Sequence, residues 1–106
     1  MKMYIRQLRR KFLEKDQLKV YINISRKAGY LIIGSERLKG YCKKLYLAIY
    51  DKSAQKNTLK VVEELNNKNI PIFAVDDLEQ LTGIKNCKLV GIKNKELSEI
   101  IANLLK

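Results

Sequence analysis

Histidine and tryptophan are absent from this 106-residue sequence, proline occurs once, and cysteine occurs twice. Without histidine the chain lacks the side chain that most often serves as a general base, and it offers no imidazole to a metal ion. Cys42 and Cys87 stand far apart, so the paired spacing of a zinc site is missing. We therefore expect two reduced, partly buried thiols, and neither a metal nor a cofactor.

Long apolar segments are also missing. The longest apolar run, residues 45–50, is too short to cross a bilayer, and charges interrupt the N-terminus where a signal peptide needs an apolar stretch. Glycine-rich phosphate-binding motifs and the serine elbow of hydrolases do not occur. Three of the four candidate catalytic carboxylates are better explained as residues that begin helices; the four are Asp51, Asp76, Asp77 and Glu79. We expect a cytoplasmic protein that is not an enzyme and has no small-molecule substrate and no membrane partner.

Acidic residues are scarce in the first 44 positions. That part carries 13 Lys/Arg against 3 Asp/Glu, whereas the remaining 62 residues carry 9 against 8, and the two parts sum to the net charge of +11. Nearly all of the excess positive charge therefore belongs to one end of the chain. Such an asymmetry favours a polyanionic partner, because neutralising phosphates releases counterions, and nucleic acid is the first candidate.

From residue 18 onwards, helical and strand-like patterns alternate. Short apolar runs predict strands over 30–33, 45–50, 70–75 and 88–92. Helical patterns lie before, between and after these strands. The first predicted helix ends at Gly29, and the fourth ends at Gly83. The predicted helix-start residues are Ser35, Asp51 or Ser53, Asp76, and Asn94. The predicted apolar helix faces are Val20, Tyr21, Ile24 and Ala28 in the first helix, and Leu59, Val62 and Leu65, with Val61 as a further candidate, in the third.

This order predicts a single small α/β domain, a three-layer α/β/α sandwich with a four-stranded, mostly central mixed sheet. Residues 18–106 form the expected domain, and residues 1–17 form a basic, helical N-terminal extension. Three interpretations of the extension remain open: a frayed basic tail, a helix packed on the domain, or a helix at a membrane surface.

Basic residues cluster around the first predicted strand. A helix N-terminus presents unpaired N–H groups that suit phosphate, and Gly34 lets another backbone approach closely. Glu36 would accept a hydrogen bond from a base amino group, or it would merely stabilise the first turn of a helix capped by Ser35. The candidate RNA-binding residues here are Arg26, Lys27, Gly34, Ser35, Glu36, Arg37, Lys39, Lys43 and Lys44.

Two blocks of sequence resemble the ribosomal protein L-seven-Ae superfamily, especially its small bacterial YlxQ-type members. Residues 21–36 read YINISRKAGYLIIGSE, and residues 47–54 read LAIYDKSA, followed by a helix and by NIPI at 69–72. The likeness covers about residues 18–106. It implies an α/β/α sandwich that binds RNA, typically a kink-turn, in which a stem bends sharply beside tandem sheared G·A pairs.

The resemblance also implies a site. The Gly-led loop and the helix after it would enter the groove at the G·A pairs, and a later loop would cover the flipped-out base. On this chain the first surface is Gly34, Ser35, Glu36, Arg37 and Lys39, with Asp51 and Lys52 at its border and Val75 and Asp76 in the later loop. Strong kink-turn binders usually have an amide or Lys where this chain has Glu36, Glu or Gln where it has Arg37, and Lys where it has Gly40. Whether this chain reads G·A pairs specifically therefore stays open.

The leading hypothesis is a non-catalytic RNA-binding protein that resembles a ribosomal protein. It would be a monomer, and its partner would be structured RNA such as ribosomal RNA, with the ribosome as a further candidate partner. One alternative is a protein-interaction adaptor that uses Tyr41, Tyr46 and the amphipathic face of residues 4–13. Another is a stand-alone RNA-recognition subunit of an RNA-modifying enzyme.

Overall fold

The computed structural model describes residues 16–40 and 45–106, with the side chains of residues 39 and 40 left out. Four strands form one mixed sheet in the order β1-β4-β2-β3, in which β4 is antiparallel to both β1 and β2, and β2 is parallel to β3. The strands are β1 (Leu31–Ile33), β2 (Leu47–Asp51), β3 (Ile72–Val75) and β4 (Leu89–Ile92). The predicted four-stranded mixed sheet is confirmed.

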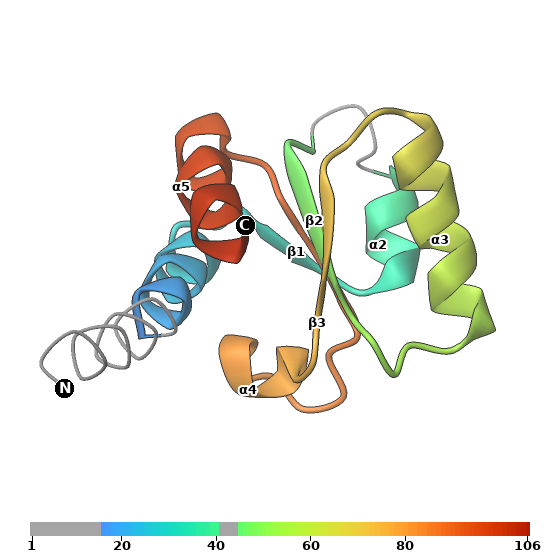
Figure 1. The fold of residues 1–106 in the computed structure, drawn as a ribbon, viewed down its shortest axis with the longest axis horizontal. Coiled ribbons are helices and arrows are strands. Elements are labelled where there is room, and N and C mark those ends of the chain that lie inside the picture. The colour runs from blue at the N-terminus through green and yellow to red at the C-terminus, as the bar shows by residue number, and fades with distance from the viewer. Residues whose placement is uncertain (1–15, 41–44) are drawn as a thin grey trace, which may run out of the picture.

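Helices cover both faces of this sheet (Figure 1). The helical segment 16–27 and α5 lie on one face, and α2 and α3 lie on the other. The short helix α4 follows β3 at one end of the sheet. The bounds are α2 (Ser35–Gly40), α3 (Lys56–Asn67), α4 (Leu78–Thr82) and α5 (Lys95–Leu105). The chain is thus a single α/β domain with helices on both sides of its sheet, as the sequence predicts.

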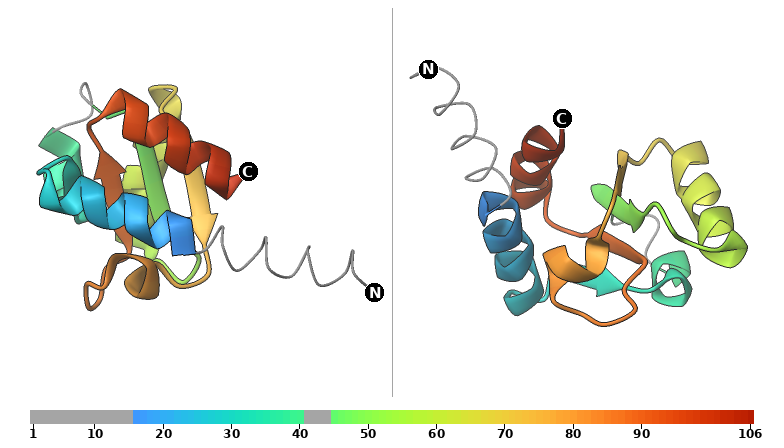
Figure 2. Two further views of the ribbon diagram at one scale, coloured as in Figure 1. Left: turned by 90° about the vertical axis from the view of Figure 1, so that its left-hand side faces the viewer. Right: turned by 60° about the horizontal axis from the view of Figure 1, so that its bottom comes forward.

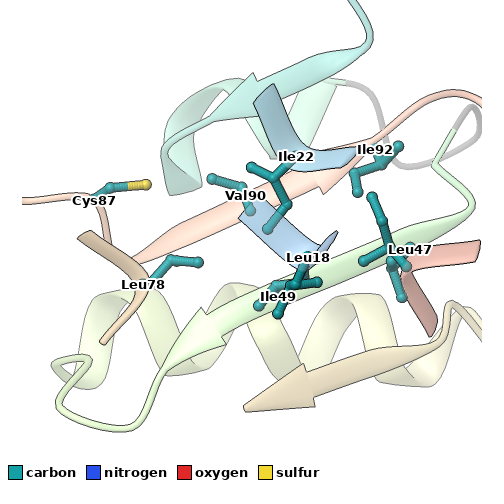
Figure 3. Packing of buried hydrophobic residues seen from close by; sticks show 9 residues of the cluster. Leu18, Ile22, Leu47, Ile49, Leu78, Cys87, Val90 and Ile92 are labelled. Atoms are coloured by element: carbon teal, nitrogen blue, oxygen red, sulfur yellow. The ribbon is translucent and has the colours of Figure 1, made fainter. Parts of the chain in front are cut away.

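Each face of the sheet has its own apolar core. Because side chains alternate along a strand, β2 sends Leu47 and Ile49 to one face and Ala48 to the other. The first core joins β2 and β4 to residues 16–27, α4 and α5 (Figure 3), and the second joins the sheet to α2 and α3. Strand β4 is buried along its whole length, since it lies in the interior of the sheet under both layers.

The first helix buries a different face from the predicted one. Leu18, Ile22 and Ser25 are buried, whereas Val20 and Ile24 are 55% and 44% exposed. The segment carries apolar residues on two faces, so its pattern alone did not decide which face meets the sheet. Ser25 tolerates burial because its hydroxyl donates to the Tyr21 carbonyl at 2.9 Å. In α3, similarly, Val61 and Leu65 are buried while Leu59 is 40% exposed.

Helix ends match the prediction in part. Asn94 caps α5, since its side chain accepts from the Leu97 N–H, and Gly29 and Gly83 have the positive φ angles that favour glycine after a helix. Helix α2 begins at Ser35, as predicted. Two predicted starts are wrong: Asp77 rather than Asp76 caps α4, and α3 begins after Gln55 rather than at Asp51 or Ser53.

Candidate nucleic-acid interface

The three chain segments that the resemblance assigns to RNA lie at one end of the sheet. Strands β1, β2 and β3 end there and β4 begins there, because Ile33 is paired with Val90, Tyr50 with Leu89, and Asp51 with Val75. We call this surface the loop edge, and define it as residues 34–37, 51–53 and 75–77 together with Lys88. It lies at the lower side of Figure 1, and the right view of Figure 2 turns it towards the reader.

Backbone hydrogen bonds join the segments of the loop edge. The Gly34 N–H donates to the Leu89 carbonyl at 3.0 Å, the Asp51 N–H to the Lys88 carbonyl at 2.9 Å, and the Lys52 N–H to the Val75 carbonyl at 2.9 Å. These bonds continue the strand pairings one residue beyond each strand. The loop edge is therefore anchored on the sheet where each loop begins.

Gly34 turns the chain from β1 into α2. Its φ of +93° lies in the region that non-glycine residues rarely adopt, and a Cβ built there would meet nothing within 4 Å. The glycine is thus required by backbone conformation, and the space in front of it is open. Ser35 is half-buried, and Glu36 and Arg37 are exposed. The side chain of Lys39, and the whole of Lys43 and Lys44, lie outside the described residues.

Asp51 is at the loop edge but its side chain is buried, with only 3% of the residue exposed. Its Oδ1 atom accepts from the N–H of Ser53 at 2.8 Å and from the Ser53 hydroxyl at 2.7 Å. Its Oδ2 atom accepts from the N–H of Leu78 at 3.0 Å. These hydrogen bonds, with the Ser53 hydroxyl contributing most, lower the pKa of Asp51 from 3.8 to about 2 against the opposing effect of burial.

These bonds explain why Asp51 does not begin α3. A carboxylate that accepts from the N–H two residues later forms an Asx turn, so the chain turns before it becomes helical. The structure places Asp51 beneath the surface that the resemblance implies it borders.

Lys88 is a member of the loop edge that the sequence analysis missed. Its ammonium donates to the Ser53 hydroxyl at 2.9 Å, and its side chain is half-buried. In the sequence it is only the first residue of a predicted strand. Its position becomes significant because β4 lies between β1 and β2, and this sheet order cannot be read from the periodicity of the chain.

The charges of the loop edge are close to balanced among the described side chains. Arg37, Lys52 and Lys88 are basic, whereas Glu36, Asp51, Asp76 and Asp77 are acidic. Lys52 and Asp76 form an ion pair with 3.1 Å between Nζ and Oδ1. A phosphate that binds in this part of the surface would therefore contact individual basic side chains, because acidic side chains nearby cancel a general positive potential.

Arg26 and Lys27 are not part of the loop edge. Both are exposed at the end of the helical segment that precedes β1, whereas Gly34 follows β1. The Tyr30 carbonyl accepts from the Lys93 N–H at 2.9 Å, which places this junction at the opposite end of β1. The intervening strand of three residues spans roughly 10 Å. The two predicted basic groups are therefore separated along the sheet.

A hollow lies beside the loop edge, between the first helix, the end of β3 and α4. Its volume is about 590 Å³, and both charged and apolar side chains line it. Lys52, Asp76 and Asp77 contribute from the loop edge, and Leu18, Val75, Leu81 and Leu105 supply apolar surface. This volume lies within the range of small-molecule pockets, and the lining places apolar side chains next to a lysine.

Within 16–40 and 45–106, no three His, Cys, Asp or Glu side chains are grouped as a metal site requires. Cys87 is buried, as expected, and burial raises the pKa of its thiol, which makes it a poor nucleophile. Over the same ranges, no helix has the length and apolar character needed to cross a membrane.

Comparison with solved structures shows that the fold is shared. A protein of unknown function from Bacillus halodurans superimposes with a TM-score of 0.73 at 20% identity, covering 83% of this chain and 95% of that one. The 15.5-kDa RNA-binding protein of Giardia lamblia superimposes with a TM-score of 0.66 at 16% identity, covering 91% of this chain and 85% of that one. No protein-family model matches the sequence, and no curated protein matches it. At these identities the likeness concerns the fold.

Proposed function

We propose that this protein binds structured RNA at the loop edge, without catalysis of its own. One observation carries the proposal: residues 34–37, 51–52 and 75–76, which are distant in sequence, meet at one end of the sheet. They are the segments that the L-seven-Ae resemblance assigns to RNA. The fold shared with the RNA-binding protein of Giardia lamblia supports the same conclusion.

The chemistry of each residue suits a different part of an RNA. Arg37 and Lys52 are exposed cations for phosphate oxygens, and the open space before Gly34 admits a sugar-phosphate backbone. Glu36, also exposed, accepts hydrogen bonds and therefore discriminates between base edges rather than attracting phosphate. The apolar side of the neighbouring hollow suits an unstacked base. A kink-turn, which combines a widened groove with a flipped-out base, supplies all of these partners.

The test is a titration with a kink-turn RNA and with a version in which the G·A pairs are replaced, each at two salt concentrations. If Lys39, Lys43 and Lys44, which follow the loop edge in the chain, also meet phosphates, contacts to about four to six phosphates would give a log–log slope on the order of −4 to −5. Preference for the intact kink-turn, lost on replacing Glu36 and Arg37 by alanine, supports base readout. Equal affinity for both RNAs discards the kink-turn, and a slope near zero discards RNA binding altogether.

A protein-binding role is the second candidate. Tyr46, Val20 and Ile24 are large apolar or aromatic side chains that are 48%, 55% and 44% exposed, which is the chemistry that protein interfaces use. Self-association that saturates without RNA and persists at high salt would favour this function over RNA binding.

A further inference from the structure

We propose that Asp51 is a positioning residue for the RNA interface, which holds two of its loops in one arrangement before RNA binds. The proposal rests on the proposed function, because it assigns Asp51 a role beneath that same surface. It replaces the place on the RNA-facing border that the family resemblance implies for this residue.

The carboxylate divides its hydrogen bonds between two distant segments. Oδ1 accepts from the backbone and hydroxyl of Ser53, and Oδ2 accepts from the N–H of Leu78, which is 27 residues from Asp51 in the chain. Ser53 directly follows Lys52, and Leu78 begins α4 two residues after Asp76. One side chain thus joins the two loops that carry Lys52 and Asp76.

The start of β4 is tied to the same group. The Lys88 ammonium donates to the Ser53 hydroxyl at 2.9 Å, and the Lys88 carbonyl accepts from the Asp51 N–H at 2.9 Å. Lys88 therefore acts on the carboxylate through Ser53 and needs no contact with RNA to affect it. Removing any of these donors would leave a buried negative charge short of partners, which proteins strongly disfavour.

Ordered loops make binding stronger because less conformational entropy is lost when the complex forms. Helix α4 has only five residues, too few to keep its position without outside contacts. The buried Leu78 side chain packs α4 against the core, and Asp51 accepts a hydrogen bond from the N–H of the same residue. The hydrogen bond from Leu78 to Asp51 is consequently a buried polar link that orients the later loop relative to Lys52, in addition to the bond from the Lys52 N–H to the Val75 carbonyl.

Charge alone predicts the opposite result, which makes the proposal testable by its sign. If Asp51 acted only as a negative charge near phosphates, Asp51→Asn would strengthen RNA binding. If Asp51 positions the loops, the same substitution weakens binding. Glu99 is the control for binding, because it is an exposed carboxylate of α5 that lines a hollow at the other end of the sheet. Asp77, an exposed carboxylate at the start of α4 that accepts from the Gln80 N–H, is the control for amide exchange only.

The experiment measures the affinity of the full chain for kink-turn RNA over a range of salt concentrations. We expect Asp51→Asn to bind about tenfold more weakly with an unchanged salt slope, because hydrogen bonds to a charged group are lost while the phosphate contacts are retained. Glu99→Gln should bind as tightly as the parent protein. Unchanged or tighter binding by Asp51→Asn would overturn the proposal.

Amide hydrogen exchange on the free protein separates this proposal from the proposed function. Asp51→Asn should accelerate exchange at both the Ser53 and Leu78 amides by about tenfold or more, whereas Asp77→Asn should accelerate Gln80. If the parent protein bound no RNA, this pattern would still show that Asp51 joins the loops while the RNA function failed. Unchanged exchange at Leu78 would overturn the proposal whatever the RNA result. Should Asp51→Asn not fold, Ser53→Ala removes one donor and the link to Lys88, and must also accelerate Leu78.

Discussion

Lys52 and Asp76 form an ion pair between the loop after β2 and the loop after β3, with 3.1 Å between Nζ and Oδ1. Their side chains are 62% and 88% exposed, so water screens the pair and it contributes at most about 1 kcal/mol to stability. The pair matters more for ligand binding. Asp76 is paired with Lys52, one of the few cations of the loop edge, and places a negative charge where a phosphate would bind.

Replacing Asp76 with asparagine should therefore strengthen RNA binding by about two- to tenfold at low salt, because Lys52 is released and one like charge disappears. The gain should shrink as salt is added. Glu99→Gln is the control, since Glu99 is an exposed carboxylate of α5 that lines a different hollow at the other end of the sheet. A weaker complex with Asp76→Asn would mean that the carboxylate itself contacts the RNA.

Lys52→Gln should reduce the slope of log affinity against log salt by about 0.7–0.9, which is the effect of losing one phosphate contact. Lys68→Gln should leave the slope unchanged, because Lys68 is an equally exposed lysine after α3 at the far end of the sheet. Fluorescence titrations at several salt concentrations measure both slopes. If the two variants lose the same amount, the positive charge acts through the whole molecule and not at the loop edge.

Acid should remove the stabilisation that Asp51 provides. The pKa of Asp51 is lowered to about 2 in the folded protein from 3.8, so its contribution is complete above about pH 4 and disappears as the pH falls through about 2. Asp51→Asn should be less stable at neutral pH by about 1.5–3 kcal/mol, and the difference from the parent should narrow between pH 4 and 2. Urea denaturation across that range measures it. A difference that stays constant over that range would contradict the assigned hydrogen bonds.

Gly91→Ala should destabilise the protein by about 1–3 kcal/mol, because α2 packs against β4 with no room for another carbon. A Cβ at Gly91 would overlap the Leu38 side chain and come within 2.6 Å of a Leu45 methyl group. In a Leu38→Ala background one of the two close contacts of the added methyl is removed and that with Leu45 remains, so the same change should cost less. Thermal unfolding of the four proteins measures this coupling, and simple additivity would argue against the close packing of Leu38 on Gly91.

Local signals in the sequence were sufficient for the order of the elements. Strand runs such as 70–75 and helix signals such as Asn94 and Gly83 depend on neighbouring residues, and the structure confirms them. Asp51 shows where local reasoning fails. Its carboxylate accepts from the nearby Ser53 and from the N–H of Leu78, 27 residues away, and the second partner cannot be inferred from neighbouring residues.

The candidate site was predictable to the same extent. The segments around Gly34, Lys52 and Asp76 were found from the sequence and its resemblance, and the fold brings them to one edge. The role of Lys88 and the separation of Arg26 from Gly34 depend on sheet order and strand direction. The distribution of charge along the chain could not reveal either feature, because it does not tell which strand ends lie at the same edge of the sheet.

Mapping of RNA-induced changes in amide chemical shifts would locate the RNA-binding surface residue by residue. On addition of a kink-turn RNA, the largest changes should fall on residues 34–37, 51–53 and 75–78 and on Lys88, while the amide shifts of Lys68, Asn69 and Lys95 at the other end of the sheet should not change. Changes centred on Lys68 and Lys95, or none at saturating RNA, would contradict RNA binding at the loop edge.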